Sequence, residues 1–356
     1  MSGFNYGAGT SQRIAKWKAQ ILKHAVPQEV LGRMGKSIKK LAIPGNSSDT
    51  AVFRRWLPKG ATTSTPNTWI VNANEHLLTE GETPNAEQIT SQDITVNLLE
   101  YGVLYRFSNR TADMYEDEVP NEMKRIAGER LGLLLEKIRW GVLKAGTNVY
   151  RSGSVASRSL ITALLTANNF RNIARGLSNN LAMKITDVLS ASFGIGTQPI
   201  EAAFIAVCHS DLEADLRSQL STFVHVSEYS TRKPIHENEL GSWEQFRFVT
   251  SPHLEPYLLA GTTATANTRL ANGVANSAGS ELVDVYPIVC LSEECFGDVM
   301  LRGLDSLSKV AMIPANTQTK DDPLGQRGYV GAAGYFAAVR LNDQQMAVFE
   351  TAASSL

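Results

Sequence analysis

Cysteine is scarce in this sequence of 356 residues, which contains only Cys208, Cys290 and Cys295. Three cysteines are too few for a disulfide framework, and their spacing matches no zinc site. We therefore expect buried, reduced thiols. Long hydrophobic runs are also missing. No stretch approaches the ~20 apolar residues of a membrane span, and the N-terminus has no apolar signal region. These absences predict a protein that is made and assembled in a cytoplasm and has no membrane partner.

The chain also has no excess of charge of either sign, because its 34 Lys and Arg residues nearly balance its 35 Asp and Glu residues. A chain with this balance is not a strong polyanion binder as a whole. The charges are nevertheless distributed unevenly. The N-terminal region carries a basic cluster in which Glu29 is the only acid: Arg13, Lys16, Lys18, Lys23, Arg33, Lys36, Lys39 and Lys40. A later stretch is acidic and contains only two basic residues, Arg106 and Arg110: Glu75, Glu80, Glu82, Glu87, Asp93, Glu100, Asp113, Glu116, Asp117, Glu118 and Glu122.

This opposition of charge favours contacts between different parts of neighbouring copies of the chain. One alternative is that the two regions are solvated faces that never meet. Another is that the basic region touches DNA phosphates without sequence specificity. We prefer contact with another protein subunit as the interpretation.

Patterns that carry chemistry are absent or incomplete. Gly194 and Gly196 form a Gly-x-Gly without a third glycine or a following Walker lysine. Cys208 and His209 are neighbours at the end of a predicted strand, where adjacent side chains point to opposite faces. A third group has metal-binding residue types without the spacing of a known ligand set: His236, Glu237, Glu239 and His253. We expect no enzyme activity, no cofactor and no metal site.

Hydrophobic periodicity predicts an α+β fold. The strongest helix is Val119–Gly146, which has a continuous apolar stripe and Pro120 in its first turn. A second helix is expected to begin after a Thr166 cap, and a third at the capping box Ser210–Glu213. Alternating or continuous apolar residues predict strands at Ala51–Leu57, Thr68–Asn72, Asp93–Phe107, Phe204–Cys208, Phe246–Val249, Leu282–Leu291, Val310–Ile313 and Tyr335–Phe349. In Asp93–Phe107 the apolar face changes parity at Leu98-Leu99, which indicates a bulge or a twist.

The segment Asp321–Thr351 is the most distinctive part of the chain. It opens with a run of turn and charged residues, Asp322–Gly328, and continues with alternating small and apolar residues. It contains no Cys and no His. The pattern favours a role in shape and self-contact, with the run at Asp322 as a rigid loop between subunits.

Taken in order, these segments resemble the major capsid protein family of N4-like tailed phages, from about Ala51 to Thr351. The resemblance is strongest at Leu77–Gly81 through Pro84 and Ile89-Thr90, at Tyr101-Gly102, at Phe204–Arg217, at Glu239–Gly241 followed by Phe246–Phe248, and at Asp322–Gly331 with Ala337–Asp343. The sequence departs from the family at two places. The family tends to have Pro where Ser210 stands, and a Trp-Lys pair is common where Ala332-Ala333 stand.

The resemblance implies an HK97-like capsid fold with four parts. They are an N-terminal arm (1–49), an extended β-hairpin loop (50–107), a peripheral domain with a spine helix (108–159 and 305–356) and an axial α/β domain (160–304). It further implies self-assembly into hexamers and pentamers of an icosahedral head that encloses double-stranded DNA. The implied partners are other copies, packaged DNA, and scaffolding, portal and decoration proteins.

Assembly would then rest on many weak contacts repeated around closed rings. The candidate contact residues are Arg13, Lys16, Lys36, Lys39, Lys40, Glu75, Glu80, Glu82, Glu87, Asp322 and Arg327. Two alternative functions remain at this point. An encapsulin-like compartment has the same fold but carries protein cargo, and a soluble α/β enzyme would not form particles.

Overall fold

The computed structural model describes residues 29–43, 49–57, 73–78, 80–81, 89–114, 119–188, 198–229, 233–263, 269–275, 282–301, 309–318 and 321–355. The chain divides into two compact units, each assembled from segments that are far apart in the sequence. The first takes in Met1–Asp49, Asn97–Leu143 and Gly297–Val339, and the second takes in Thr50–Val96, Lys144–Phe296 and Arg340–Leu356. Helices and strands occur in both, so the predicted α+β class is confirmed.

The first unit is built on a five-stranded sheet and one long helix. The sheet has the strand order β1-β14-β16-β15, and β4 pairs with β16 in addition. The elements are β1 (Ile38–Ile43), β4 (Leu99–Ser108), α2 (Asn109–Met114), α3 (Val119–Leu143), β14 (Phe296–Leu301), β15 (Lys309–Ile313) and β16 (Arg327–Arg340). Two single turns of 3-10 helix, Leu31–Arg33 and Gly35–Ser37, precede β1.

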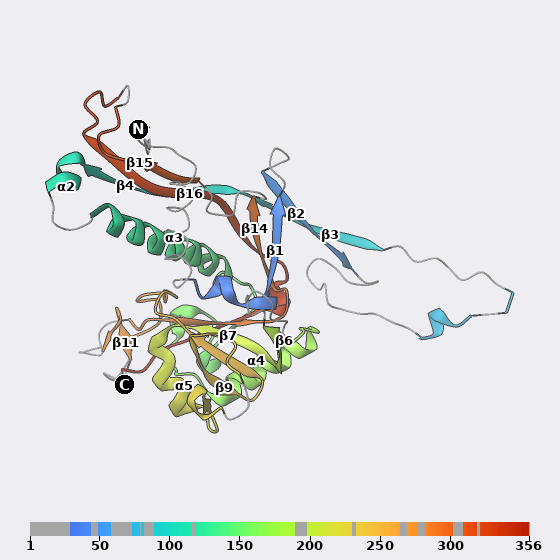
Figure 1. Ribbon diagram of the computed structural model, residues 1–356. Coiled ribbons are helices and arrows are strands. Elements are labelled where there is room, and N and C mark those ends of the chain that lie inside the picture. Colours follow the sequence, from blue (N-terminus) through green and yellow to red (C-terminus); the bar gives the residue numbers. More distant parts are fainter. Residues whose placement is uncertain are drawn as a thin grey trace. The chain divides into compact units, whose positions relative to one another are not determined.

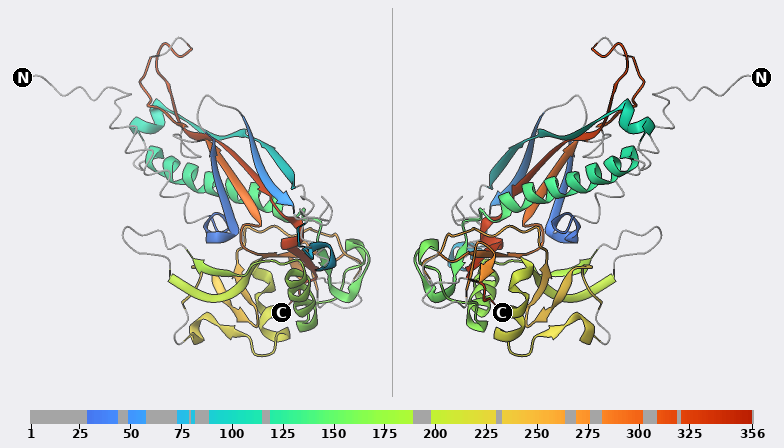
Figure 2. Two further views of the ribbon diagram at one scale, coloured as in Figure 1. Left: turned by 90° about the vertical axis from the view of Figure 1, so that its right-hand side faces the viewer. Right: turned by 90° about the vertical axis from the view of Figure 1, so that its left-hand side faces the viewer.

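The helix α3 lies along the sheet and covers the apolar face of β4 and β16 (Figures 1 and 2). On β4 the side chains of Tyr101, Val103 and Phe107 join a core that includes Leu131 and Leu135 of α3. Alternation along a strand places these side chains on one face and leaves Leu104 exposed on the other. The predicted helix is confirmed, although it ends at Leu143 and not at Gly146.

The second unit is built on an eight-stranded mixed sheet. Its order is β5-β17-β13-β7-β10-β9-β8, with β6 paired to β7. The elements of this unit are β2 (Thr50–Leu57), β3 (Thr90–Asn97), β5 (Val149–Arg151), α4 (Ala167–Asn179), β6 (Ile185–Val188), β7 (Gln198–Cys208), α5 (Glu213–Gln219), β8 (Val224–His225), β9 (Glu239–Trp243), β10 (Phe246–Thr250), β11 (Leu270–Ala271), β12 (Val274–Ala275), β13 (Tyr286–Leu291) and β17 (Ala347–Thr351).

The core of this sheet is aromatic. Phe170 of α4 makes edge contacts with the rings of Trp243, Phe246, Phe248 and Phe349, at centroid distances of 5.4 to 6.2 Å. The four buried residues of α4 are those that the helical spacing predicts: Phe170, Ile173, Ala174 and Leu177. The residues with the largest apolar area therefore fix this helix against the sheet.

A separate two-stranded sheet pairs β2 with β3. Arg54 and Asp93 tie the two strands together through a bidentate contact with N–O distances of 2.8 and 2.9 Å. Both side chains are exposed, so water and salt screen the pair and it contributes little stability. The predicted strand Thr68–Asn72 lies outside the described residues.

Three local predictions need correction. The predicted single strand Asp93–Phe107 is two strands that break at Leu98, where the sequence predicted a bulge or a twist, and the second strand pairs with β16. Thr166 precedes α4 without a side-chain capping bond. Before α5, His209 caps the 3-10 turn Ser210–Leu212 because its ring accepts the Asp211 N–H at 3.1 Å, so Ser210 is not the capping residue.

The C-terminal strand belongs to the eight-stranded sheet. β17 pairs antiparallel with β13 and parallel with β5 there. Val348 and Phe349 are fully buried, which is the physical reason for this placement. The predicted domain boundaries, with residues 305–356 in the peripheral domain, stay a prediction.

Candidate functional site

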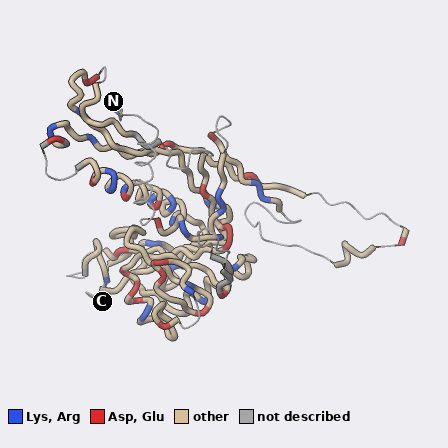
Figure 3. The backbone as a smooth tube through the Cα atoms, in the orientation of Figure 1, with Lys and Arg blue, Asp and Glu red and all other residues tan. Residues whose placement is uncertain are grey.

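The predicted basic contacts fall into two groups. Arg13 and Lys16 lie outside the described residues. Lys36 is half-buried in a 3-10 turn, whereas Lys39 and Lys40 are exposed on β1. Figure 3 colours the backbone by residue type, and positions of Lys and Arg alternate with positions of Asp and Glu along much of the chain. Within residues 29–43 of the arm, Glu29 is the only acid beside Arg33, Lys36, Lys39 and Lys40.

The predicted acidic contacts are only partly described. Glu75 belongs to the 3-10 helix Ala73–His76, and Glu80 is exposed in a turn. Glu82 and Glu87 lie outside the described residues. Pairing between this acidic stretch and the basic arm of another copy stays a prediction.

The same stretch exposes apolar residues that the charge pattern did not single out. Leu77 is 79% exposed, Leu78 is 72% exposed, and Ile89 and Trp56 are also largely exposed. Large apolar side chains that gather on one segment mark interaction surfaces more often than scattered ones do. The run Leu77-Leu78-Thr79-Glu80 could have given this signal, because two leucines stand there in an otherwise polar loop.

Asp322 and Arg327 are brought together by the backbone of their loop. The Arg327 N–H donates to Asp322 Oδ2 at 2.8 Å, and the Gly325 N–H donates to the Asp322 carbonyl at 3.1 Å. Gly325 has φ +65°, a conformation that favours glycine, and its carbonyl accepts the Asn316 N–H at 2.7 Å. Asp322 therefore organises the loop from within its own subunit.

The Arg327 side chain is exposed and lines a pocket of about 440 Å³ together with Arg106. These two arginines come from β16 and β4, where Tyr329 lies opposite Arg106 in the antiparallel register. The pocket is a candidate contact for an acidic partner. Sequence reasoning missed Arg106 because it lies on a strand in the acidic stretch.

A buried ion cluster in the first unit was also missed. Arg139 of α3 donates from Nη1 to Glu29 Oε2 and from Nε to Asp298 Oδ2, both at 3.0 Å. Its guanidinium also lies 4.9 Å from the ring centroid of Phe336. One turn earlier on α3, Glu136 accepts the Leu31 N–H at 2.9 and 3.1 Å. An aspartate inside the apolar strand Phe296–Leu301 was the one available signal.

Burial dominates the electrostatics of this cluster. It raises the pKa of Glu136 to about 7, against the opposing effect of the Leu31 N–H and the Arg139 charge. Burial also raises the pKa of Asp298. Burial opposes the charge on Arg139, but the charges of Asp298 and Glu29 outweigh it and raise the pKa of the guanidinium.

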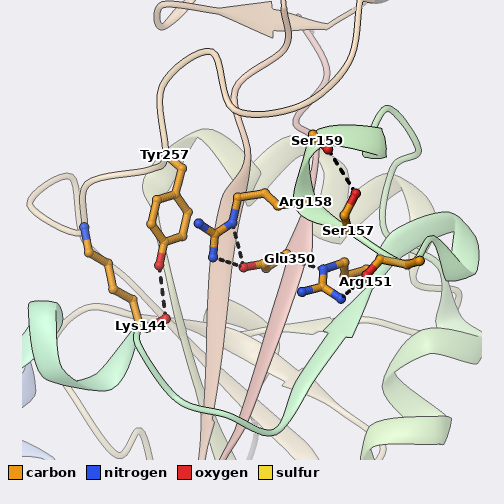
Figure 4. Close-up of polar contacts among 8 residues, drawn as sticks. Lys144, Arg151, Ser157, Arg158, Ser159, Tyr257 and Glu350 are labelled. Atoms are coloured by element: carbon orange, nitrogen blue, oxygen red, sulfur yellow. Dashed lines mark hydrogen bonds and ion pairs between the residues drawn. The ribbon is translucent and has the colours of Figure 1, made fainter.

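A second buried carboxylate lies in the other unit (Figure 4). Glu350 of β17 has no exposed side-chain surface, and Arg151 Nε and Arg158 Nε donate to its two oxygens at 3.0 and 2.8 Å. The Arg158 guanidinium stacks 3.6 Å from the ring centroid of Tyr257. Because two arginines bind one buried carboxylate, the segment that follows β5 is held against strand β17.

Further hydrogen bonds around this ion pair hold the neighbouring backbone segments together. The Tyr257 hydroxyl donates to the Lys144 carbonyl at 3.1 Å, and Arg151 Nη1 donates to the Ala156 carbonyl at 2.9 Å (Figure 4). Ser157 and Ser159 share a hydroxyl hydrogen bond at 2.9 Å. These contacts hold the backbone in place and activate no nucleophile.

The residues considered for catalysis have structural roles. All three cysteines are free and buried, as predicted, and burial raises the pKa of the Cys208 thiol to about 12. His209 uses its ring nitrogen as a helix cap, and Asp211 Oδ2 accepts the Tyr286 hydroxyl at 2.8 Å. Glu239 accepts the Tyr229 hydroxyl at 2.9 Å and the Ile235 N–H.

Among the residues that the structure describes, no three His, Cys, Asp or Glu side chains are grouped as the ligands of a metal ion would be. Within the same ranges, no helix has the length and apolar character that crossing a membrane requires.

Known family models and curated protein sequences give no match to this chain. Solved structures do. The capsid of cyanophage P-SCSP1u matches with a TM-score of 0.54 and 13% identity, over 92% of this chain and 89% of that one. The capsid of Ralstonia phage GP4 matches with a TM-score of 0.56 and 10% identity, over 89% and 87%. The cyanophage Pam1 capsid matches with a TM-score of 0.54 and 14% identity, over 98% and 95%. At these identities the likeness is one of fold, and the chain has the HK97-like fold.

Proposed function

We propose that this chain is a major capsid protein that assembles into the hexamers and pentamers of an icosahedral phage head. The observation that carries the proposal is the shared fold, which extends over nearly the whole of this chain and of three phage capsid chains. The matched chains are phage capsid proteins, so the role that we propose for this chain is a structural one.

The exposed apolar residues of the stretch before β3 support self-assembly. Exposure of the apolar side chains of Leu77 and Leu78 to water is unfavourable in an isolated subunit. Burial of these side chains against another copy would remove this free-energy cost. The partner that we propose for this surface is therefore a second copy of the chain. Repetition of such contacts around closed rings converts modest contributions into a stable shell.

The finer parts of the proposal rest on the sequence resemblance. They are membership of the N4-like tailed phages, enclosure of double-stranded DNA, non-specific contact with that DNA, assembly in the host cytoplasm, and cooperation with scaffolding, portal and decoration proteins. The exposed Lys39 and Lys40 are suited to either an acidic neighbour or DNA phosphates.

Electron microscopy of the expressed full chain tests the proposal. Closed shells, tubes or rings of subunits are the expected result, and a uniform population of small monomers or dimers would contradict it. The nucleic-acid content of purified infectious or native particles separates a genome-containing head from the alternative, an encapsulin-like compartment filled with protein.

A further inference from the structure

We propose that residues 29–34 are held on α3 by a proton-linked clamp, in which Glu136 takes up a proton as the segment docks. The segment is then released more readily at neutral and higher pH than under mildly acidic conditions. This clamp lies within one subunit, and the inference does not depend on the proposed function.

The first half of the clamp is a backbone contact with a buried carboxylate. The Leu31 N–H donates to Glu136 Oε1 at 2.9 Å and to Oε2 at 3.1 Å, across 105 residues of sequence. Both Glu136 and Leu31 are fully buried. Release of residues 29–34 would therefore expose Glu136 to water and remove this hydrogen bond.

The second half is the pairing of Glu29 with Arg139. The Glu29 carboxylate lies 3.0 Å from Arg139 Nη1, and the Arg139 side chain is only 3% exposed. Gly32 allows this approach, because a Cβ at its position would lie 2.8 Å from Arg139 Nη1 and would also overlap the Glu29 carboxylate. The segment is thus fitted to the helix at two adjoining points.

The charges around the clamp do not balance. The segment contributes Glu29, β14 contributes Asp298, and α3 contributes Glu136 and the guanidinium of Arg139. Lys40 of β1 acts on Asp298 from the strand that follows the segment. Asp298 Oδ1 is buried and has no hydrogen-bond partner among the described residues. Three carboxylates face the charge of Arg139 and, at Asp298, that of Lys40, so a proton on one carboxylate would relieve buried negative charge.

A proton on Glu136 is compatible with docking. A neutral carboxyl group keeps a carbonyl oxygen that accepts the Leu31 N–H, so protonation removes charge without removing the contact. Burial accounts for the raised pKa of Glu136, about 7, whereas an exposed glutamate titrates near ~4.3. The docked state therefore holds more proton than the released state between these two values.

The direction of the pH effect follows from this difference. As pH rises through the window, the docked state must give up a proton that the released state has already lost, so docking weakens and then stays constant above about pH 7. The raised pKa of Asp298 acts in the same direction.

Hydrogen exchange of the full chain, followed by mass spectrometry, tests the clamp. Protection factors of peptides that cover residues 29–34 are measured from about pH 5.5 to about pH 8 and corrected for intrinsic exchange. Sedimentation verifies an unchanged assembly state. We expect protection to fall roughly tenfold or more across this range. Peptides from β7 and β13 in the other unit should show no matching change.

Two substitutions separate the clamp from general pH effects. Glu136→Gln should abolish the pH dependence, and Glu122→Gln, an exposed position on the same helix, should leave it unchanged. A wild-type segment whose protection does not change with pH would overturn the proposal without reference to any variant. An equal fall in wild type and Glu136→Gln would overturn it as well.

Discussion

Arg139 on α3 and Asp298 on β14 form an ion pair of 3.0 Å between residues that are 159 positions apart in the sequence. Asp298 has no exposed side-chain surface, and Arg139 has only 3%. A pair this deeply buried adds little net stability over an apolar pair, but breaking it leaves a charge without a partner. Several expected results depend on this asymmetry.

Replacement of Arg139 should destabilise the protein strongly. Arg139→Met leaves the Asp298 and Glu29 carboxylates without their cation, with an expected loss of about 3–5 kcal/mol in the free energy of unfolding. Arg125→Met is the matched control on the same helix, because its pairs with Glu122 and Glu129 are far more exposed, and it should cost much less stability than Arg139→Met. Urea unfolding measures both, and equal losses would contradict the role given to the buried pair.

Two glycines of the first unit should respond to alanine with opposite signs. At Gly32 a Cβ would push against Arg139, which Asp298 holds in place, so Gly32→Ala should lower the melting temperature. At Gly141 on α3 a Cβ meets nothing within 4 Å, so Gly141→Ala should stabilise the helix by up to ~1 kcal/mol. Thermal unfolding gives the comparison. A stabilising Gly32→Ala would mean that residues 29–34 do not pack on α3 as described.

The stability of the whole chain should carry a matching pH signature. The folded-state pKa of Glu136 is raised to about 7, so the folded protein holds the extra proton between roughly pH 4.5 and pH 7, and stability falls as pH rises through that window. Glu136→Gln removes this loss, and the variant should be more stable than wild type at about pH 8 by roughly 2–4 kcal/mol, with a smaller difference near pH 5. Unfolding curves at the two pH values are the measurement. If the wild type were more stable than Glu136→Gln at both pH values, the predicted effect of Glu136 on stability would be refuted.

The loop at Asp322 should depend on an acceptor oxygen and not on negative charge. Asp322→Ala removes the acceptor for the Arg327 N–H and should cost about 0.5–1.5 kcal/mol of local stability, whereas Asp322→Asn keeps an acceptor and should cost less. Hydrogen exchange at residues 325–328 reports the loop directly. If Asn were as damaging as Ala, the charge of Asp322 would act on something other than its own loop.

Local sequence patterns predicted the helices and strands that are amphipathic, with one buried face and one exposed face. The apolar spacing from Phe170 to Leu177 identified the buried face of α4, and the change of parity at Leu98 marked the break between β3 and β4. In each case the periodicity of the side chains matches the face that is buried. Such features are local, and a sequence displays them directly.

Features that depend on contacts between distant segments were not predictable in the same way. The pairing of β17 with β13 and β5 was not predicted, because the sequence of an apolar strand does not specify which strands it pairs with. The cluster of Glu29, Glu136, Arg139 and Asp298 draws on the arm, α3 and β14, so its members look like ordinary charged residues in the sequence. Its signature was weak: one aspartate inside an apolar strand.

Sedimentation velocity of the purified full chain, beside a double substitution in its exposed apolar stretch, tests shell formation most directly. Leu77→Glu with Leu78→Glu places charge on side chains that are 79% and 72% exposed, so the subunit fold should survive while contacts with other copies are lost. Leu77→Met with Leu78→Met keeps the apolar surface and serves as the control. We predict large, fast-sedimenting particles for wild type and the methionine variant, and small species for the glutamate variant. A wild type that sediments only as a small species would contradict the central claim that this chain builds a shell.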